Sequence, residues 1–435
     1  MNPSRTNTDR THLDRTRLSR FHVNQETRMT TTHSRPAPSA AAHAPAPTRA
    51  ELVARAEALQ PLLREHAARI EAERRVTDEV IEALTEAGLF KLTVPRRFGG
   101  YESDVRTLID VTAAIAEGDG STGWVTAVVN TCNWLAALFP EQAQEEVFGA
   151  HPDVRVTGVF GPTATSRKVE GGWRMTGRWY YNSGSSHSSW ALLGMPVTDE
   201  DGEVVDQAMV LVPRSELTLE DTWFVAGLRG TASNCVIAED VFVPGHRVMS
   251  VPGAIEGDVP ADHGPSGLFR TAFAPLLAVG LAGPQLGLGR AALKLVTEKT
   301  ATKPISYTYY ETQRESVGVQ LQVAEAAMKI DTAHLHVHRA ADDLDTAAAR
   351  SDDLDVLTRA RVRADTGHAI DNLMSALGTL LNVHGAGSFA DTNALQRIWR
   401  DASVAGRHAA STPAVGMEIY GKLLLGVEER ITPFV

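Results

Sequence analysis

The chain has 435 residues, of which 43% are hydrophobic and 22% are charged, and its formal net charge is −11. This composition predicts a globular protein of two or three domains, or one large multilayer unit, and excludes a chain too polar to fold. The negative charge argues against a nucleic-acid or acidic-membrane partner. No apolar run reaches the roughly 18–20 residues that a membrane span needs. The only cysteines, Cys132 and Cys235, cannot form a disulfide framework and lack metal-site spacing, which favours a reducing cytoplasm.

The first 48 residues differ from the rest in composition. Arginines are scattered among Ser, Thr, Asn and His, and a Pro/Ala stretch follows at residues 37–47. Such a segment contains too little apolar surface to offset the entropy lost on ordering, so residues 1–48 are predicted to form a disordered tail. The composition also resembles that of a transit peptide. Met29 would serve as a start codon as well as Met1 does.

Residues 49–152 are predicted to form an N-terminal helical domain. Apolar residues recur every three or four positions over residues 51–87, with a new N-cap at Thr77, and again over residues 105–117, 122–139 and 140–148. The sequence GDGST at residues 118–122 is expected to end one helix and cap the next.

A change of apolar period from 3.6 to 2 near Val154 predicts a β-domain over residues 153–252, built as a small barrel or sandwich. Gly and Asp residues at 170–172 and 199–202 are typical of hairpin connections. The predicted strands are residues 154–160, 173–182, 190–197, 207–212 and 236–243.

After a Gly/Pro/Asp-rich linker at residues 253–267, long helical patterns predict a C-terminal four-helix bundle over residues 268–435. The glycines at 283–289 are expected to permit close packing rather than to bind phosphate. The fold class is therefore α+β, in the order helices, strands, helical bundle. The predicted helices cover residues 271–300, 309–349, 354–381, 393–409 and 415–428.

Several familiar motifs are incomplete in this sequence. The GxxxxGK match at residues 416–422 lacks the following Ser/Thr and has no strand before it, and no GxGxxG follows a strand, so a self-contained NAD(P)H site is not expected. Only His334 and His338 of three alternating histidines share a helix face, so no metal site is predicted. Ser183–Ser189 contains His187, but without a GxSxG elbow it does not indicate a hydrolase.

Two segments have the composition of a binding site. Residues 179–190 (WYYNSGSSHSSW) combine aromatic rings, hydroxyls and a tight glycine turn, which suits a flat ring that is apolar on its faces and polar along one edge. A surface hairpin with an aromatic face explains the same pattern. Residues 398–408 (IWRDASVAGRH), placed on a helix, let a flat ligand approach small residues and end at His408. The alternative is a buried helix with a satisfied core histidine.

With these two segments and GDGST at 118–122, the helix–β–helix order resembles the acyl-CoA dehydrogenase fold over roughly residues 52–425. It is more similar to the fold's two-component oxygenase branch, the reduced-flavin-dependent monooxygenases. That branch includes the oxygenase components of p-hydroxyphenylacetate and secoandrostatriene-dione hydroxylases, and dibenzothiophene monooxygenase. Acyl-CoA dehydrogenases follow the RDA sequence with a Tyr-Glu-Gly-Thr motif that often supplies the base. Here residues 400–402 run on to His408 with no carboxylate at that place.

The resemblance implies roles for particular residues. His408 would be catalytic, stabilising a flavin C4a-hydroperoxide and moving the substrate's proton, and Ser183 would lie beside flavin N5. Cofactor contacts are implied for Trp190 and Arg270. A neighbouring subunit of a homotetramer would supply phosphate contacts, for which this chain offers Lys303, Ser306 and Tyr307. Substrate contacts are implied for Asn130, Asn133 and Trp134.

The resemblance thus implies reduced FMN or FAD as cofactor, FMN slightly preferred, with O₂ as co-substrate and a separate NAD(P)H:flavin reductase as partner. The reaction would be hydroxylation of an aromatic or polyketide-like small molecule. Three alternatives stay open: N-oxygenation of an amine or amino sugar by the same intermediate, an acyl-CoA dehydrogenase, and a non-catalytic flavin-binding or assembly protein.

Overall fold

The computed structural model describes residues 46–199, 201–261 and 267–435, so the predicted tail lies almost wholly outside the described residues. The N-terminal helices are those expected, with one capping box: the Thr48 side chain accepts from the Glu51 backbone N–H at the start of the first helix. Their bounds are α1 Arg49–Glu73, α2 Asp78–Glu86, α3 Val105–Ala116, α4 Gly120–Ala137 and α5 Glu141–Phe148.

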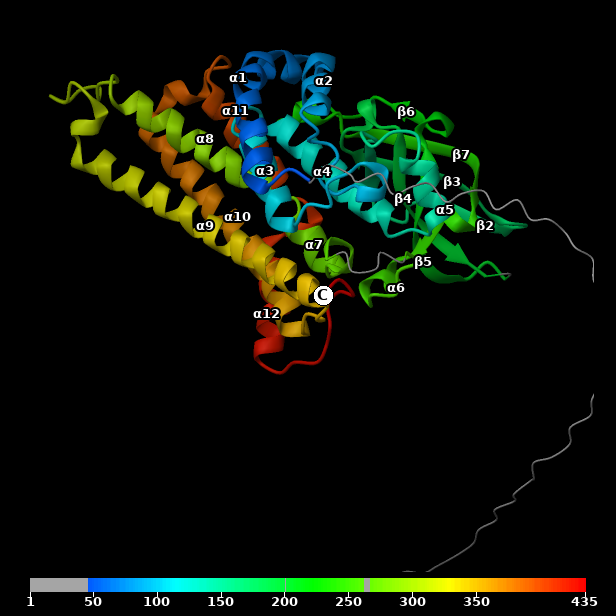
Figure 1. Cartoon of the computed structure of the whole chain (residues 1–435). Coiled ribbons are helices and arrows are strands. Elements are labelled where there is room, and N and C mark those ends of the chain that lie inside the picture. The colour runs from blue at the N-terminus through cyan, green and yellow to red at the C-terminus, as the bar shows by residue number, and fades with distance from the viewer. Residues whose placement is uncertain (1–45, 200, 262–266) are drawn as a thin grey trace, which may run out of the picture. The chain divides into compact units, whose positions relative to one another are not determined.

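Helix α4 is the centre of the fold (Figure 1). All of its residues are buried, which is the condition of a helix enclosed on every side. It packs against α3, α8, α11 and strand β1. The cap predicted within residues 118–122 is Asp119, whose carboxylate accepts from both the backbone N–H and the hydroxyl of Thr122 at 2.8 and 2.7 Å.

The strands form two four-stranded sheets with the orders β1-β4-β5-β8 and β2-β3-β7-β6, which confirms the α+β class and gives a sandwich. All pairs are antiparallel except the parallel pair β1–β4. The short strands β2, β6 and β8 were not predicted, because three to five residues carry little period-2 signal. The bounds are β1 Val156–Val159, β2 Thr165–Val169, β3 Gly172–Asn182, β4 Trp190–Thr198, β5 Val204–Pro213, β6 Thr218–Glu220, β7 Asn234–Pro244 and β8 Val248–Ser250.

Helices α8, α9 and α10 lie on the other side of α4 from the strands, whereas α6 lies beside β5 (Figure 1). The predicted helix over 271–300 is two helices, because the chain breaks at Gly280–Ala282 before Pro284 starts the second. The helix predicted from residue 309 begins only at Val317, and the linker's first residues form a short helix. The bounds are α6 Val251–Ile255, α7 Phe273–Val279, α8 Gly283–Thr300, α9 Val317–Arg350, α10 Val356–His384, α11 Ala394–Ala405 and α12 Pro413–Leu424.

The α7–α8 stretch, Phe273–Thr300, has the length and hydropathy of a membrane span, but 78% of its most apolar window is buried inside the protein. Its glycines explain how it packs there. A Cβ on Gly287 would lie 2.1 Å from the Ala113 carbonyl oxygen, and one on Gly283 would lie 2.2 Å from the Thr112 hydroxyl. The prediction that these glycines permit close packing is therefore confirmed.

The helix predicted to run to residue 409 ends at Ala405, and this correction matters for the site. Gly406 caps α11, and His408 lies in the following turn at the start of a 3₁₀ segment, Ala409–Ser411. The apolar period continued past the helix, but the backbone leaves the helix after Gly406, whose N–H still bonds to the Ala402 carbonyl oxygen. His408 thus takes its direction from a turn, not from a helix face.

Replacing Gly287 with Ala should destabilise the protein by about 1–3 kcal/mol, because the α3 backbone cannot move away without disturbing the core. Chemical denaturation measures this. Gly378→Ala in α10 is the matched control, because the Cβ that alanine would add there meets no atom within 4 Å and alanine favours a helix. Equal stability of Gly287→Ala and the wild type would contradict the close approach of α3 and α8.

Candidate active site

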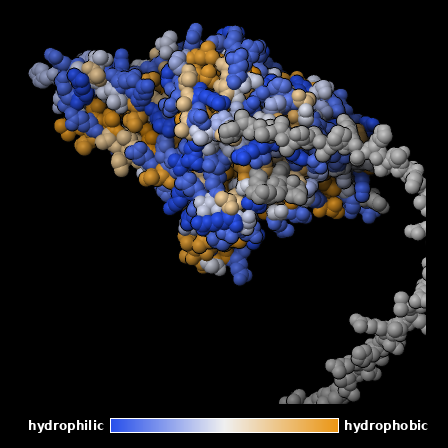
Figure 2. Space-filling model, viewed as in Figure 1, coloured by the Kyte–Doolittle hydropathy of each residue, from blue (hydrophilic) through white to orange (hydrophobic). Residues whose placement is uncertain are grey.

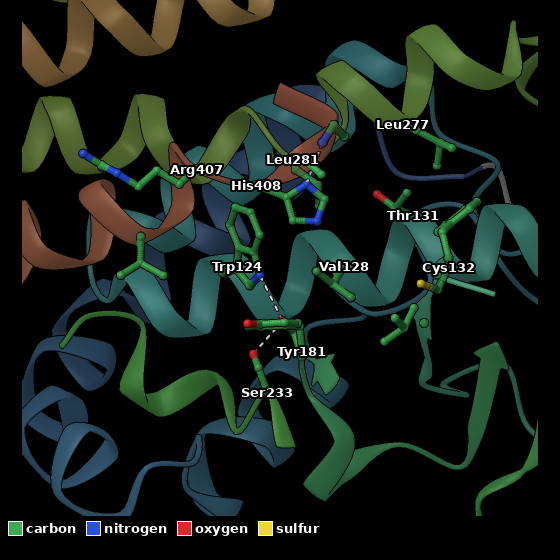
Figure 3. Close-up of a pocket in the computed structure, with 18 of the residues that line it drawn as sticks. Trp124, Val128, Thr131, Cys132, Tyr181, Ser233, Leu277, Leu281, Arg407 and His408 are labelled. Carbon is green, nitrogen blue, oxygen red and sulfur yellow. Dashed lines mark hydrogen bonds between the residues drawn. The ribbon is translucent and has the colours of Figure 1, made fainter. Parts of the chain in front are cut away.

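A cavity of about 970 Å³ lies between α4, the ends of β1 and β3, α7, and the turn after α11 (Figure 3). One face of α4 forms a wall, through Trp124, Val128, Thr131, Cys132 and Leu135, at the spacing of a single helix side. Apolar side chains dominate the remaining lining, and no Asp or Glu of the described chain is among the lining residues.

His408 and Ser183, which are 225 positions apart in the sequence, both line this cavity. His408 is an exposed residue and is one of those that line the cavity. Protein atoms surround the ring closely enough that burial lowers its pKa below the usual 6.5. The imidazole is therefore neutral at pH 7.

The tautomer of His408 follows from its neighbours. The Ala410 backbone N–H donates to Nδ1 at 3.3 Å, so this nitrogen must be the acceptor. In the neutral ring the proton then resides on Nε2. The Trp124 indole packs edge-on to the ring, with centroids 5.6 Å apart at 63°. His408 is thus a neutral N–H donor held by a backbone group and an aromatic ring.

Ser183 is directed to the cavity by an irregularity in β3. Tyr181 has φ 68°, and the register with β7 shifts between Trp179 and Asn182. Such a shift re-aims the side chains that follow it. The Ser183 hydroxyl accepts from Trp124 Nε1 at 3.2 Å and lies 2.7 Å from the Ser233 hydroxyl. Figure 3 shows Trp124, Ser233 and His408 around one space.

Asp401 holds the other side of this site, although sequence reasoning assigned it no role beyond its place in the RDA segment. Its Oδ1 accepts from the Leu228 backbone N–H at 2.6 Å, which fixes a loop where Leu228 and Ala232 have φ of 52° and 45°. Burial, with the charge of Asp119 nearby, raises the pKa of Asp401 to about 7. The carboxyl therefore joins α11 to the loop that carries Ser233.

The other predicted site residues lie elsewhere. Asn130 and Asn133 are on α4, but their amides bind backbone groups of residues 89–92 and 154–156. Trp134 donates to the Leu268 carbonyl at 3.0 Å. These three side chains leave α4 on other sides than the cavity wall, because a helix turns about 100° per residue.

The predicted cofactor contacts also lie outside the cavity lining. Trp190 packs under the Arg247 guanidinium at 5.0 Å. Arg270 donates to the Ala348 carbonyl and Lys303 to the His384 carbonyl. Ser306 and Tyr307 are exposed on the loop before α9. Of the predicted site residues, only His408 and Ser183 line the same cavity within one chain.

Other reactive side chains have structural partners. His187 Nε2 lies 2.8 Å from the Val76 carbonyl oxygen, so this nitrogen pairs with the backbone and not with a serine hydroxyl. Burial raises the pKa of the Cys132 thiol to about 12, so it remains protonated. Across the described ranges, no three His, Cys, Asp or Glu side chains are placed to hold a metal ion.

Residues 52–148 match the family model of the acyl-CoA dehydrogenase N-terminal domain, and residues 279–413 match that of the C-terminal domain. The chain is 34% identical to the oxygenase subunit HsaA of a flavin-dependent monooxygenase from Rhodococcus jostii, over 84% of this chain and 96% of that protein. It is 31% identical to the oxygenase component of the FADH₂-dependent resorcinol hydroxylase of Rhizobium sp., over 89% of this chain and 98% of that protein. The structure of XiaF from Streptomyces sp. in complex with FADH₂ and glycerol matches with a TM-score of 0.83 and 40% identity, over 89% and 97% of the two chains.

The chain therefore belongs to the acyl-CoA dehydrogenase family. The described lining of the cavity contains His408 and no carboxylate that could remove a proton beside a thioester. The protein is an oxidoreductase of that family, an oxygenase component of the flavin-dependent monooxygenases.

Replacing Asp401 with Asn should alter how stability depends on pH. A carboxyl whose folded pKa is raised binds its proton more tightly when folded, so its contribution is full below about pH 4 and is lost as pH rises through about 7. Asparagine keeps the acceptor for Leu228 and has no charge. The melting temperature of the variant relative to wild type should rise between pH 5 and 8. A constant difference, equal to that of the exposed-carboxyl control Asp353→Asn, would contradict this role.

Proposed function

We propose that the protein takes reduced flavin from a separate NAD(P)H:flavin reductase and hydroxylates an aromatic small molecule in the cavity, in the cytoplasm. Bound reduced flavin would supply the activation of O₂. The observation that carries the proposal is the meeting of His408 and Ser183 on one largely apolar cavity that has no carboxylate in its described lining. Apolar walls suit the faces of a flat ring, and the two polar side chains suit its edge.

The chain's own residues supply three functions in this proposal. Leu277, Leu281 and Phe160 exclude water from the reacting atoms. Nε2 of His408 donates its proton to an oxygen atom of the bound reactants, and once that proton has been transferred Nε2 can accept one from the substrate. Ser183 lies beside the edge of the flavin ring.

We propose FAD as the cofactor, although the resemblance seen in the sequence slightly favoured FMN. The support is that XiaF, at 40% identity, binds FADH₂ and the resorcinol hydroxylase, at 31%, depends on it, whereas the FMN-bound TdsC from Paenibacillus sp. is only 18% identical. Titration of the protein with FADH₂ and FMNH₂ under anaerobic conditions should give the lower Kd for FADH₂. Tighter binding of FMNH₂ would overturn this choice.

Charge supports a neutral or anionic aromatic substrate over an amine. Arg363 and Arg407 are among the lining residues, and no lining carboxylate from the described segments can pair with an ammonium group. A cationic amine would meet like charge in a cavity with little water. Phenols should therefore give hydroxylated product with FADH₂ and O₂, whereas matched benzylamines should give none. N-oxide formation from an amine would support the competing reaction.

His408→Ala should uncouple the reaction, with FADH₂ consumption maintained, hydroxylated product reduced about 10²-fold or more, and H₂O₂ released instead. His246→Ala, whose ring pairs with Glu146 at the surface, is the control and should remain coupled. In the wild type, coupling should fall only below about pH 6.5, because burial lowers the pKa of His408. Full coupling in His408→Ala would reject the role.

We also propose a homotetramer. Apolar side chains follow one side of α9 at Val317, Leu321, Met328 and Leu335, each 61–71% exposed, and Figure 2 shows apolar residues gathered over this end of the molecule. The loop before α9 exposes Tyr307 and Tyr309 fully and carries Ser306. A second copy would bury these surfaces and bring Lys303, Ser306 and Tyr307 within reach of a neighbour's cofactor phosphate.

Light scattering should give the mass of four chains for the wild type and a smaller mass for Leu335→Asp, because a buried interface does not accept an unpaired charge. Val205→Asp, at an exposed position of β5, should not change the mass. A monomeric wild type would overturn the proposed assembly.

A further inference from the structure

The Ser183 hydroxyl ends a chain of hydrogen bonds whose direction is determined by its far end. Thr231 Oγ1 lies 2.8 Å from the Leu228 carbonyl oxygen, which has no proton to give, so Thr231 must be the donor. The Leu228 carbonyl is fixed in turn, because it also accepts from Trp223 Nε1 at 2.8 Å and its own N–H donates to Asp401.

Each following hydroxyl has one proton, so the direction passes along the chain. Thr231 has used its proton, so across the 2.7 Å contact Ser233 donates to Thr231. Ser233 has then used its proton, so across the next 2.7 Å contact Ser183 donates to Ser233. Any other assignment leaves two oxygens in contact without a proton between them.

The same reasoning fixes what Ser183 presents to the cavity. Its proton goes to Ser233, and one lone pair accepts from Trp124 Nε1 at 3.2 Å. One lone pair remains, so Ser183 can accept a hydrogen bond from a ligand but cannot donate one. All the hydroxyls of the chain are buried, with exposures of 8% for Ser183, 3% for Ser233 and 0% for Thr231, so water does not easily reverse it.

We infer that Ser233 and Thr231 are positioning residues that orient Ser183 as an obligate acceptor, so that the site selects the reduced over the oxidised flavin. This inference rests on the proposed function, in which Ser183 lies beside the ring edge. The reduced ring carries an N–H at N5, which is a donor, whereas the oxidised ring has only a lone pair there. The N5–H of the reduced ring can donate a hydrogen bond to the Ser183 oxygen. The oxidised ring would instead place the N5 lone pair against the Ser183 oxygen, so that two acceptors face each other.

The test compares Kd values for oxidised FAD and for FAD reduced under anaerobic conditions, by titration of protein fluorescence. The wild type should bind the reduced form more tightly. Ser233→Ala and Thr231→Val free the Ser183 proton to turn toward the ligand, so the ratio of the two Kd values should fall about three- to tenfold. Thr231→Ser keeps the hydroxyl and should keep the ratio, as should the exposed control Ser186→Ala.

Reduced 5-deaza-FAD has CH₂ in place of the N5–H, so it isolates the bond in question. In the wild type it should bind more weakly than reduced FAD by a similar factor, and in Ser233→Ala and Thr231→Val that difference should shrink. This comparison holds with the wild type alone if a variant does not fold. An unchanged ratio in folded variants, or equal binding of reduced FAD and its deaza analogue by the wild type, would overturn the inference. A wild type that binds neither redox form of FAD would overturn the proposed function, and the inference with it.

Discussion

The complete burial of α4 is the constraint on which the other elements depend. A helix enclosed on every side cannot leave its polar side chains to bulk water, so most of them pair within the protein, whereas the buried Thr131 hydroxyl, which lines the cavity, has no partner among the described residues. The Asn130 amide donates to the backbone of the N-terminal helical domain, and the Asn133 amide donates to the backbone just before β1. Asp119 caps the start of α4. Once those partners are fixed, the remaining face of α4, with Trp124 at one end, becomes the cavity wall.

The site is assembled by backbone features outside regular structure. His408 lies in a turn after α11, Ser183 follows a bulge in β3, and Ser233 follows a loop in which Leu228 and Ala232 take left-handed conformations. Turns, bulges and loops can take side-chain directions that a regular helix or strand does not offer, and the rigid elements hold them in place. Asp401 connects these parts, because it extends from α11 to the backbone of that loop.

The described cavity lining has no carboxylate and contains His408. This composition agrees with membership of the oxygenase branch rather than with a dehydrogenase. A fold does not fix its chemistry, and a cavity whose described lining has no carboxylate suits a reaction other than proton removal beside a thioester. Burial keeps the imidazole neutral, and the Ala410 N–H, which donates to Nδ1, keeps the ring proton on Nε2.

The order of helices and strands, a helix cap within residues 118–122 and the close packing at Gly283–Gly289 could all be predicted from the amino-acid sequence, and family resemblance placed His408 and Ser183 at one site. These features follow from periodicity, turn chemistry and motif, which are local properties. Three-dimensional packing was needed to establish that α11 ends at Ala405, that Asn130 and Asn133 hold the backbone, and that Thr231 and Ser233 orient Ser183. A side chain's direction and its hydrogen-bond partner depend on which distant segments pack against it, and spacing along the chain does not contain that information.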